Sequence, residues 1–293
     1  MENFFTRYTD SSAVLPSFPI VQHNCLGSWD VFLSLCHSFT MLPQPHLLVA
    51  IQDPHSRRSV LPTFPGFMSF APPPPGRPRV AIYVSRTLNQ HLSCSTVFHG
   101  SSDMLSVDVF SPEGLFGSPN RSIMVTSVYL LRTNSPPYRS ILPERLFSCL
   151  SYPHLVLGDF NLHHPLADPC HSLSEREFTI STRYFDDAFE VLYHLGNTPG
   201  VYTRFPFDTI SRPSVLDLAF VNSALSSFVS WWDTPLPSTG SDHVPCVITL
   251  KPPAIMLPPY PTLGPPRPRY GRKNSGYLHH TTQPREAHTQ LHE

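Results

Sequence analysis

Several short apolar stretches of this sequence end, or begin, at residues that can bind a metal ion or transfer protons. They are Asn24, Asp53, the Asp159 and Asn161 of Gly158-Asp159-Phe160-Asn161, Asp217, and the adjacent pair Asp242-His243. Functional residues tend to lie on loops just beyond the ends of strands. These positions are therefore the first candidates for a site.

The carboxylates in this set suit a hard divalent cation. Mg²⁺ prefers oxygen ligands and is usually held by one or two carboxylates together with substrate phosphate and water. Asp53 and Asp242 can supply those oxygens. We therefore expect a Mg²⁺ (or Mn²⁺) site to which Asp53, Asp242 and the nearby Asn24 contribute.

The remaining residues suit proton transfer during phosphodiester hydrolysis. A histidine near its ordinary pKa can move protons or hold a phosphate oxygen when a carboxylate fixes its tautomer. His243 fits this role, with Asp217 as the carboxylate. Asp159 can activate a water molecule, and Asn161 can position that water or the phosphate.

Each residue also has an ordinary structural interpretation. Asp159 after a glycine and Asp53 before Pro54 are both typical of turns. A histidine that follows an aspartate, such as His243, is often a surface or capping residue. Asp217 lies inside an apolar run, where a buried carboxylate needs a partner, and the alternative interpretation is a paired aspartate with a structural role only.

The surrounding sequence predicts an α/β domain. Runs rich in Val, Ile, Leu, Phe and Tyr, bounded by Pro, Gly, Ser or Asn, indicate strands. These runs are 19–24, 46–53, 79–85, 104–110, 122–131, 154–159, 214–222 and 244–250. Helices are expected after Ser28, with Trp29, Phe32, Leu33, Cys36 and Phe39 on one side, then over 139–150, and over 174–195 from a capping box.

Composition divides the chain into three parts. We expect a lead over 1–18, a domain over 19–251, and a disordered tail over 252–293 in which apolar periodicity stops. Residues 1–250 carry 14 Lys and Arg against 19 Asp and Glu, whereas residues 251–293 carry 6 against 2. An acidic body suits a metal site lined by carboxylates and argues against a broad basic surface for nucleic acid.

The sequence carries no signal for export or for a membrane. No apolar run approaches the ~18 residues that span a bilayer, and the first ten residues lack the layout of a signal peptide. The six cysteines include no CxxC pair, so we expect buried thiols and not a zinc ribbon. These features predict an intracellular protein without a membrane partner.

The order of the motifs resembles the endonuclease/exonuclease/phosphatase superfamily. It reads Asn, Asp, Tyr, Gly-Asp-Phe-Asn, Ser-x-x-Asp-Leu and Ser-Asp-His across residues 19–251. The resemblance implies a four-layer α/β sandwich, in which two packed mixed sheets are flanked by helices. It implies an active site at one end of that sandwich.

The resemblance also implies a role for each matching residue. Asn24, Asp53 and Asp242 correspond to residues near the metal, and Asp53 stands where the superfamily usually has a Glu. Tyr129 corresponds to a tyrosine that contacts the scissile phosphate, although a tyrosine in a strand has an equally ordinary structural interpretation. Asp159 and Asn161 correspond to the pair that orients the attacking water, and Asp217 and His243 to the carboxylate–histidine pair.

A narrower resemblance points to the endonucleases of fungal LINE-type (non-LTR) retrotransposons. It rests on Gln22 to Asp30, Ile51 to Pro54, Ser69 to Pro73, and Gly158 to Pro165, which includes His163 and His164. It implies DNA as the substrate, a reverse transcriptase domain beyond this chain as the partner, and a nuclear location. We assign no chemistry to the two histidines, for which a surface loop is a likelier setting than a metal site.

Two other functions stay open at this point. One is a phosphatase of the same superfamily, which would need a basic pocket for extra phosphates, and no Lys or Arg cluster accompanies the motifs. The other is an inactive, truncated copy of a retrotransposon. The shorter arm of Asp53 and the tail after about Gly271, which is unlike the continuation of such elements, are what suggest it.

Overall fold

The computed structural model describes residues 17–40, 47–56, 60–74, 76–97, 101–112, 121–131, 143–148, 152–233 and 239–251. All of them fall within one unit, Met1–Pro253. The expected lead, except for its last two residues, and the expected tail over 252–293 lie outside this set. In the described part of the chain no helix is long and apolar enough to cross a membrane.

The first sheet has six strands in the order β11-β12-β1-β2-β4-β3. Its central pair, β1 and β2, is parallel, and every other pair is antiparallel. The strands are β1 (Phe18–Asn24), β2 (Leu48–Gln52), β3 (Phe67–Phe70), β4 (Val80–Ser85), β11 (Val229–Asp233) and β12 (Cys246–Leu250).

The second sheet also has six strands, in the order β5-β6-β7-β8-β10-β9. Here β7 and β8 are parallel and the other pairs are antiparallel. The strands are β5 (Ser93–Val97), β6 (Met104–Phe110), β7 (Ser122–Tyr129), β8 (His154–Asp159), β9 (Tyr193–Leu195) and β10 (Asp217–Asn222).

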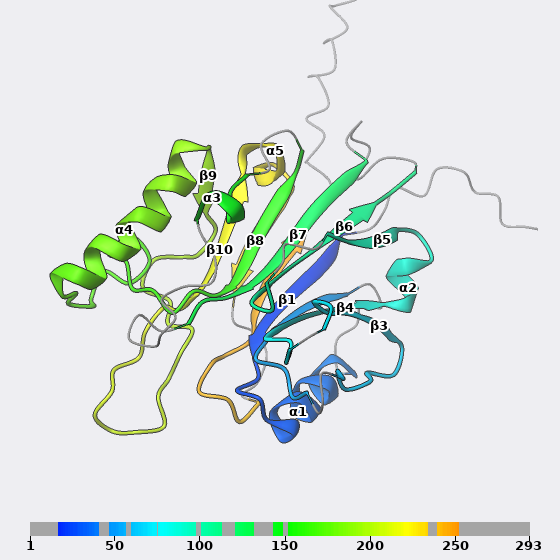
Figure 1. Ribbon diagram of the computed structural model, residues 1–293, viewed down its shortest axis with the longest axis horizontal. Coiled ribbons are helices and arrows are strands. Elements are labelled where there is room, and N and C mark those ends of the chain that lie inside the picture. The colour runs from blue at the N-terminus through cyan, green and yellow to red at the C-terminus, as the bar shows by residue number, and fades with distance from the viewer. Residues whose placement is uncertain are drawn as a thin grey trace, which may run out of the picture. The chain divides into compact units, whose positions relative to one another are not determined.

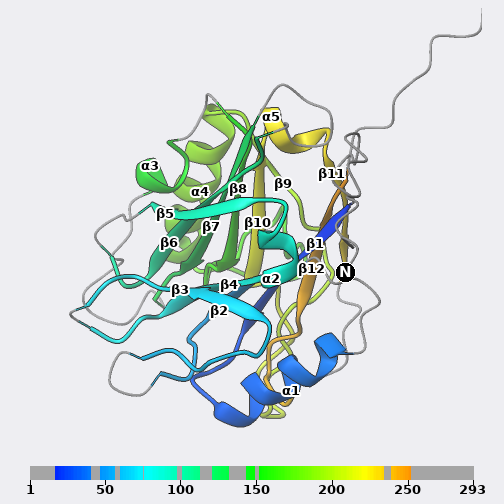
Figure 2. The same cartoon turned by 90° about the vertical axis from the view of Figure 1, so that its right-hand side faces the viewer.

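Helices cover the outer face of each sheet, so the domain has four layers (Figures 1 and 2). The helix α1 (Trp29–Thr40) packs on the first sheet, whereas α3 (Pro143–Leu146) and α4 (Glu175–Glu190) pack on the second. Two short helices, α2 (Arg86–Asn89) and α5 (Ser223–Ser226), complete the described elements. The expected four-layer α/β sandwich of two mixed sheets is confirmed.

The core between the two sheets is apolar at one end and polar at the other. Alternate residues of a strand share a face, and on β1 the inward row runs from Phe18 and Ile20 to Gln22 and Asn24, all buried. Strand β8 repeats this change, because its inward row ends at Asp159. The strands thereby deliver polar side chains to one end of the sandwich.

The structure differs from the expected elements in several places. The expected helix over 174–195 ends at Glu190, where Leu192 takes a φ of +63° and the chain enters strand β9. In α1, Trp29 and Leu33 are exposed, although both were expected on the apolar side. Of the expected helix over 139–150, the described residues form only the turn α3, and strands β3, β5 and β11 were not expected.

Gly158 is required by the close pairing of β7 with β8. Its φ is +152°, and a Cβ added there would lie 1.9 Å from the carbonyl oxygen of Val128. We therefore expect Gly158→Ala to lower the free energy of unfolding by about 3 kcal/mol or more, because backbone must shift to relieve the overlap. Thermal melting followed by circular dichroism measures this.

Gly196→Ala is the matched control, because its added Cβ would meet only ordinary contacts, the nearest at 3.4 Å from Ala219. A Gly158→Ala protein that melts at the wild-type temperature would show that the two strands separate here without cost.

Candidate active site

A buried histidine–carboxylate pair forms the centre of the polar end. His243 Nδ1 lies 2.7 Å from Asp217 Oδ2, and both side chains are almost fully buried. An ionised carboxylate only accepts hydrogen bonds, so Nδ1 carries the hydrogen and donates it. The other ring nitrogen, Nε2, faces Asp159 Oδ2 at 3.9 Å and Asp242 Oδ1 at 3.8 Å. Asp217 therefore fixes the tautomer and the direction of the imidazole.

A chain of neutral polar residues supports Asp217 from the opposite sheet. Gln22 Nε2 donates to Asp217 Oδ1 at 2.6 Å and lies 2.8 Å from Gln52 Oε1. The Gln52 amide donates in turn to Ser127 Oγ at 2.9 Å. Sequence reasoning missed Gln22, Gln52 and Ser127, although polar residues inside apolar strands were a usable signal, because buried polar groups need partners.

Asp159 is held by two asparagines. Asn24 Nδ2 donates to its Oδ2 at 2.8 Å, and the backbone N–H of Asn161 donates to its Oδ1 at 2.9 Å. The Asn161 amide also donates to the carbonyl oxygen of Leu130 at 2.8 Å. These bonds leave the side chain of Asp159 fixed beside His243, so Asn24 positions a carboxylate here.

The surroundings of His243 and Asp159 raise the pKa of both side chains. Burial alone would lower the pKa of His243, but the Asp217 carboxylate, assisted by Asp159 and Asp242, raises that pKa to about 9. Burial, together with the charge of Asp217, raises the pKa of Asp159 to about 6, against the opposing effect of His243. His243 is therefore an imidazolium at neutral pH, and Asp159 is a stronger base than an ordinary carboxylate.

The two expected carboxylate metal ligands are each paired with an arginine. Asp242 Oδ2 accepts from Arg204 Nε at 2.7 Å, and Asp53 Oδ1 lies 3.1 Å from an Arg77 guanidinium nitrogen. The sequence shows no Lys or Arg cluster beside the motifs, and the structure brings one arginine to each of these two aspartates. These arginines reach the site from other parts of the chain, which adjacency in sequence does not reveal.

Tyr129 lies at the same end of the sandwich and contacts a third arginine. The guanidinium of Arg79 lies 4.3 Å from the centre of the Tyr129 ring, and its Nε lies 3.9 Å from Asp103 Oδ1. Burial, followed by the charge of Asp159, raises the pKa of the Tyr129 hydroxyl. The hydroxyl therefore keeps its proton and can donate a hydrogen bond.

The donor set at this site fits a hard cation. Asp242 Oδ1 is buried and, among the described residues, has no hydrogen-bond partner. Buried carboxylate oxygens without partners are costly unless a cation or a proton satisfies them. Asp159 Oδ2 and Asp242 Oδ1 both face His243 Nε2, and these carboxylate oxygens match Mg²⁺ or Mn²⁺ better than softer metals. Asp53 and Asp242, the two expected carboxylate ligands, belong to no group of three described His, Cys, Asp or Glu ligand atoms within 4.8 Å.

The backbone is strained where the strands deliver these residues. Four non-glycine residues in the described part of the chain have positive φ, and three of them follow β1, β2 or β8 directly: Leu26, Asp53 and Asn161. Aspartate and asparagine tolerate this region better than other residues do. Strain of this kind is typical of functional sites.

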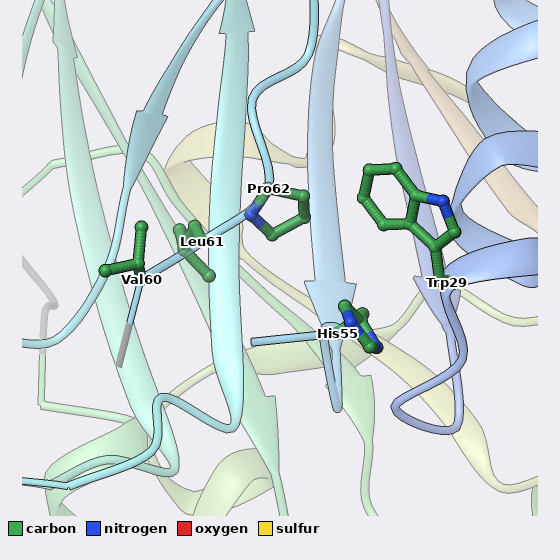
Figure 3. A pocket seen from close by; sticks show the side chains of 5 residues that line it. All are labelled: Trp29, His55, Val60, Leu61 and Pro62. Atoms are coloured by element: carbon green, nitrogen blue, oxygen red, sulfur yellow. The ribbon is translucent and has the colours of Figure 1, made fainter. Parts of the chain in front are cut away.

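Two other features lie apart from this cluster. A cavity of about 410 Å³ is lined by Trp29, His55, Val60, Leu61 and Pro62 (Figure 3), and it includes none of the expected site residues. The expectation of a surface setting for His164 was wrong, because its ring is buried and stacks on Phe185 with the ring centres 3.8 Å apart.

The sequence profile of the endonuclease/exonuclease/phosphatase family matches residues 43–243. The chain belongs to this family. No curated protein sequence matches it. Membership supports a hydrolase of phosphodiesters or phosphomonoesters and agrees with the fold implied by the sequence motifs.

Solved structures share this fold at low sequence identity. The endonuclease domain of TRAS1, a telomere-specific non-LTR retrotransposon, superimposes with a TM-score of 0.58 at 17% identity, over 81% of this chain and 99% of that one. The apurinic endonuclease LMAP of Leishmania major gives 0.61 at 14% identity, over 84% and 92%. The 3′-5′ exonuclease NExo of Neisseria meningitidis gives 0.55 at 14% identity, over 80% and 99%.

The pairing of His243 with Asp217 predicts a distinct dependence of stability on pH. The pKa of His243 is raised in the folded state to about 9, above its unfolded value of about 6.5. The stability it contributes is therefore complete below pH ~6.5 and is lost as pH rises through about 9. In buffer with EDTA, wild-type melting temperature should fall across this window, and the His243→Gln variant should fall less.

Asp159 does not obscure this window, because its pH-dependent contribution lies between an unfolded pKa of ~3.9 and its folded pKa of about 6, below pH 6.5. If the melting temperatures of the two proteins fall equally between pH 6.5 and 9.5, the imidazolium of His243 gains no stabilisation from the charge of Asp217.

Proposed function

We propose that this protein is a metal-dependent endonuclease that nicks DNA. The observation that carries the proposal is the orientation of His243, whose Nδ1 is held by Asp217 while its Nε2 faces Asp159 and Asp242. A histidine held in this way is suited to stabilise negative charge on a phosphate.

The residues divide the hydrolytic step between them. Asp159 accepts the proton of a water molecule as its oxygen bonds to phosphorus, and the bond from phosphorus to the 3′ oxygen breaks. The His243 imidazolium donates a hydrogen bond to a phosphate oxygen, where negative charge develops. The 3′ oxygen takes up a proton, which leaves a 3′-hydroxyl and a 5′-phosphate. Tyr129 and Asn161 orient the phosphate and the water.

A divalent cation is part of the proposal, with Asp53, Asp242 and Asn24 as the residues that would hold it. The free oxygen of Asp242 supports this assignment. When bound, such a cation polarises the phosphate and stabilises developing charge on oxygen. Arg77 and Arg204 pair with Asp53 and Asp242 and offset part of the negative charge of these carboxylates.

An exposed apolar loop beside the cluster supports a polymeric substrate. Residues 205–213 follow Arg204, and this yellow-green loop extends from the domain in Figure 1. Phe207 and Ile210 are 73% and 91% exposed near its tip. Apolar side chains that project in this way can insert between bases or stack on them, whereas a small phosphorylated molecule would gain nothing from them.

The biological setting we propose is that of a non-LTR retrotransposon, in which the nick provides a primer for a reverse transcriptase in the nucleus. The motifs quoted from the sequence support this, and TRAS1 shares the fold. A phosphatase is the weaker alternative, because Arg77 and Arg204 are each engaged by a carboxylate of the site.

The first test is nicking of supercoiled plasmid with Mg²⁺ or Mn²⁺ and with EDTA. We expect activity only with a divalent cation, and we expect His243→Ala to lower the rate about 10²-fold or more, the usual scale for an acid–base group. Asp217→Asn should also lower it, and the double variant should lose less than the two single losses combined, because the residues act as one unit.

His194→Ala is the control for this test, because His194 is an exposed histidine on β9. If folded His243→Ala and Asp217→Asn proteins nick plasmid at the wild-type rate, His243 and Asp217 do not act as the proposed catalytic pair. Hydrolysis of small phosphomonoesters without any nicking would favour the phosphatase.

The exposed loop gives a second test, which separates DNA binding from chemistry. Replacing both Phe207 and Ile210 with serine should raise the KM for plasmid about tenfold or more, the scale of lost stacking on a base. Hydrolysis of bis(p-nitrophenyl) phosphate, which is too small to reach the loop, should not change. Phe178→Ser on α4, where the side chain is 47% exposed, is the matched control. An unchanged KM for plasmid would remove the loop from substrate binding.

A further inference from the structure

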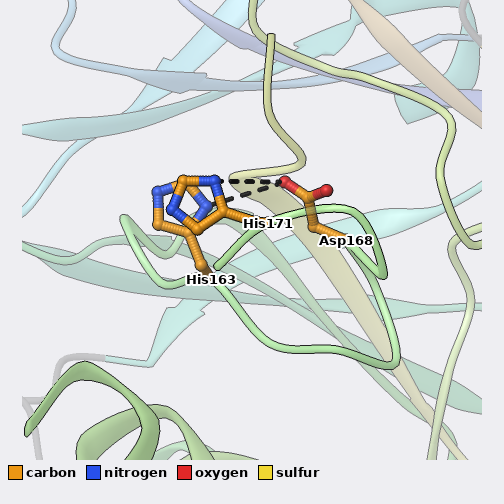
Figure 4. A group of neighbouring side chains, drawn as sticks. All are labelled: His163, Asp168 and His171. Carbon is orange, nitrogen blue, oxygen red and sulfur yellow. Dashed lines mark ion pairs between the residues drawn. The ribbon is translucent and has the colours of Figure 1, made fainter. Parts of the chain in front are cut away.

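A second group of metal-binding side chains lies on the loop that follows β8. His163, Asp168 and His171 place one ligand atom each within 4.8 Å of the others, and in the described part of the chain no other three His, Cys, Asp or Glu residues do so. The two imidazoles face the same carboxylate oxygen, Asp168 Oδ2, as Figure 4 shows. The group is distinct from the cluster around His243, with which it shares no residue.

The distances in this group do not correspond to hydrogen bonds. His163 Nδ1 lies 3.7 Å from Asp168 Oδ2, and His171 Nδ1 lies 4.0 Å from it, whereas N–H···O bonds span about 2.7–3.2 Å. His163 Nδ1 is buried and has no hydrogen-bond partner among the described residues. A buried polar atom without a partner requires an explanation, and a metal ion that it binds is one.

The same distances are close to those around a tetrahedral metal ion. Zinc binds imidazole nitrogen at about 2.0–2.1 Å and carboxylate oxygen at about 2.0–2.2 Å, so neighbouring ligand atoms lie about 3.4 Å apart. The spacings from Asp168 to the two histidines exceed this by a few tenths of an ångström. The two imidazoles stack in parallel, with ring centres 3.5 Å apart and an angle of 2° between the planes, so one ring must turn before both nitrogen lone pairs point at the same ion.

The chemistry of the donors distinguishes this group from the active site. Two imidazole nitrogens and one carboxylate oxygen favour Zn²⁺, whereas Mg²⁺ prefers oxygen ligands alone. Asp168 is almost fully buried, and the two histidines retain some exposure, 20% for His163 and 28% for His171. A water molecule can therefore reach the fourth position.

We propose that His163, Asp168 and His171 form a structural Zn²⁺ site that fixes the loop carrying Asp159 and Asn161. His163 follows Asn161 by two residues. Asp168 Oδ2 also accepts from the backbone N–H of Val215 at 3.3 Å, two residues before Asp217. The ion thereby links the segment of the water-activating carboxylate to the segment of the histidine's partner.

The test measures zinc binding to the full chain, purified without a polyhistidine tag and stripped of metal. Zinc is titrated against a chromophoric chelator, for the wild type and for the double variant His163→Gln/His171→Gln. We expect the double variant to lose one equivalent of tightly bound zinc. We also expect zinc, but not Mg²⁺, to raise the melting temperature of the wild type alone, because an ion that binds only the folded state stabilises it.

His194→Gln is the matched control and should keep the full equivalent, since His194 lies on β9, outside the group. Zinc bound by other histidines, including those of residues 252–293, is present in every variant, so it cancels when the variants are compared. Substitution with Co²⁺ gives a second measurement, because tetrahedral Co²⁺ absorbs visible light strongly, and we expect this band in the wild type and in the His194→Gln variant only.

A single variant, Asp168→Asn, covers the case in which the double variant does not fold. Its amide oxygen can still accept from Val215, but the charge is gone, so we expect zinc to bind at least tenfold more weakly. Equal zinc affinity and stoichiometry in the wild type and in the folded variants would overturn the proposal. No step of the test depends on nicking, so the nuclease proposal can fail while this one stands, or the reverse.

Discussion

A carboxylate with no exposed surface governs how the two sheets meet. Asp217 accepts a hydrogen bond from Gln22 on the first sheet and another from His243 just before β12, while its own strand belongs to the second sheet. A buried charge is costly unless hydrogen bonds and opposite charge compensate it. Its partners must therefore be in place for the sandwich to close, so folding and assembly of the site are one event.

The division of the inter-sheet core into an apolar and a polar end follows from that constraint. Apolar side chains such as Ile20 and Leu157 pack between the sheets, in the part of the core that contains no residue of the candidate site. The same rows end in Asn24 and Asp159, whose hydrogen bond joins the two sheets again at the polar end. Because the apolar packing makes the sheets rigid, the donors and acceptors at the polar end stay within hydrogen-bonding distance of one another.

Local patterns in the sequence predicted the strands that carry long apolar runs and the residues at their ends. They missed β5 and β3, whose residues are largely exposed or half-buried at sheet edges, so burial left no pattern to detect. The pairing of Arg204 with Asp242 and of Arg77 with Asp53 was also unpredictable, because it depends on how distant segments meet. The pairing of His243 with Asp217 was expected from the carboxylate inside an apolar run, which needs a partner when buried, and from the order of the motifs.

The loop that carries Phe207 and Ile210 is closed at its base by a pair of backbone hydrogen bonds between Arg204 and Ser214. All residues between these two except the half-buried Pro206 are exposed, whereas Arg204 itself donates to Asp242. Length and composition of the intervening segment can therefore change without disturbing the base, since closing a longer loop costs little extra entropy. The fold thus separates an exposed segment whose sequence and length can vary from Arg204 and Asp242 at its base, whose pairing any variant must keep.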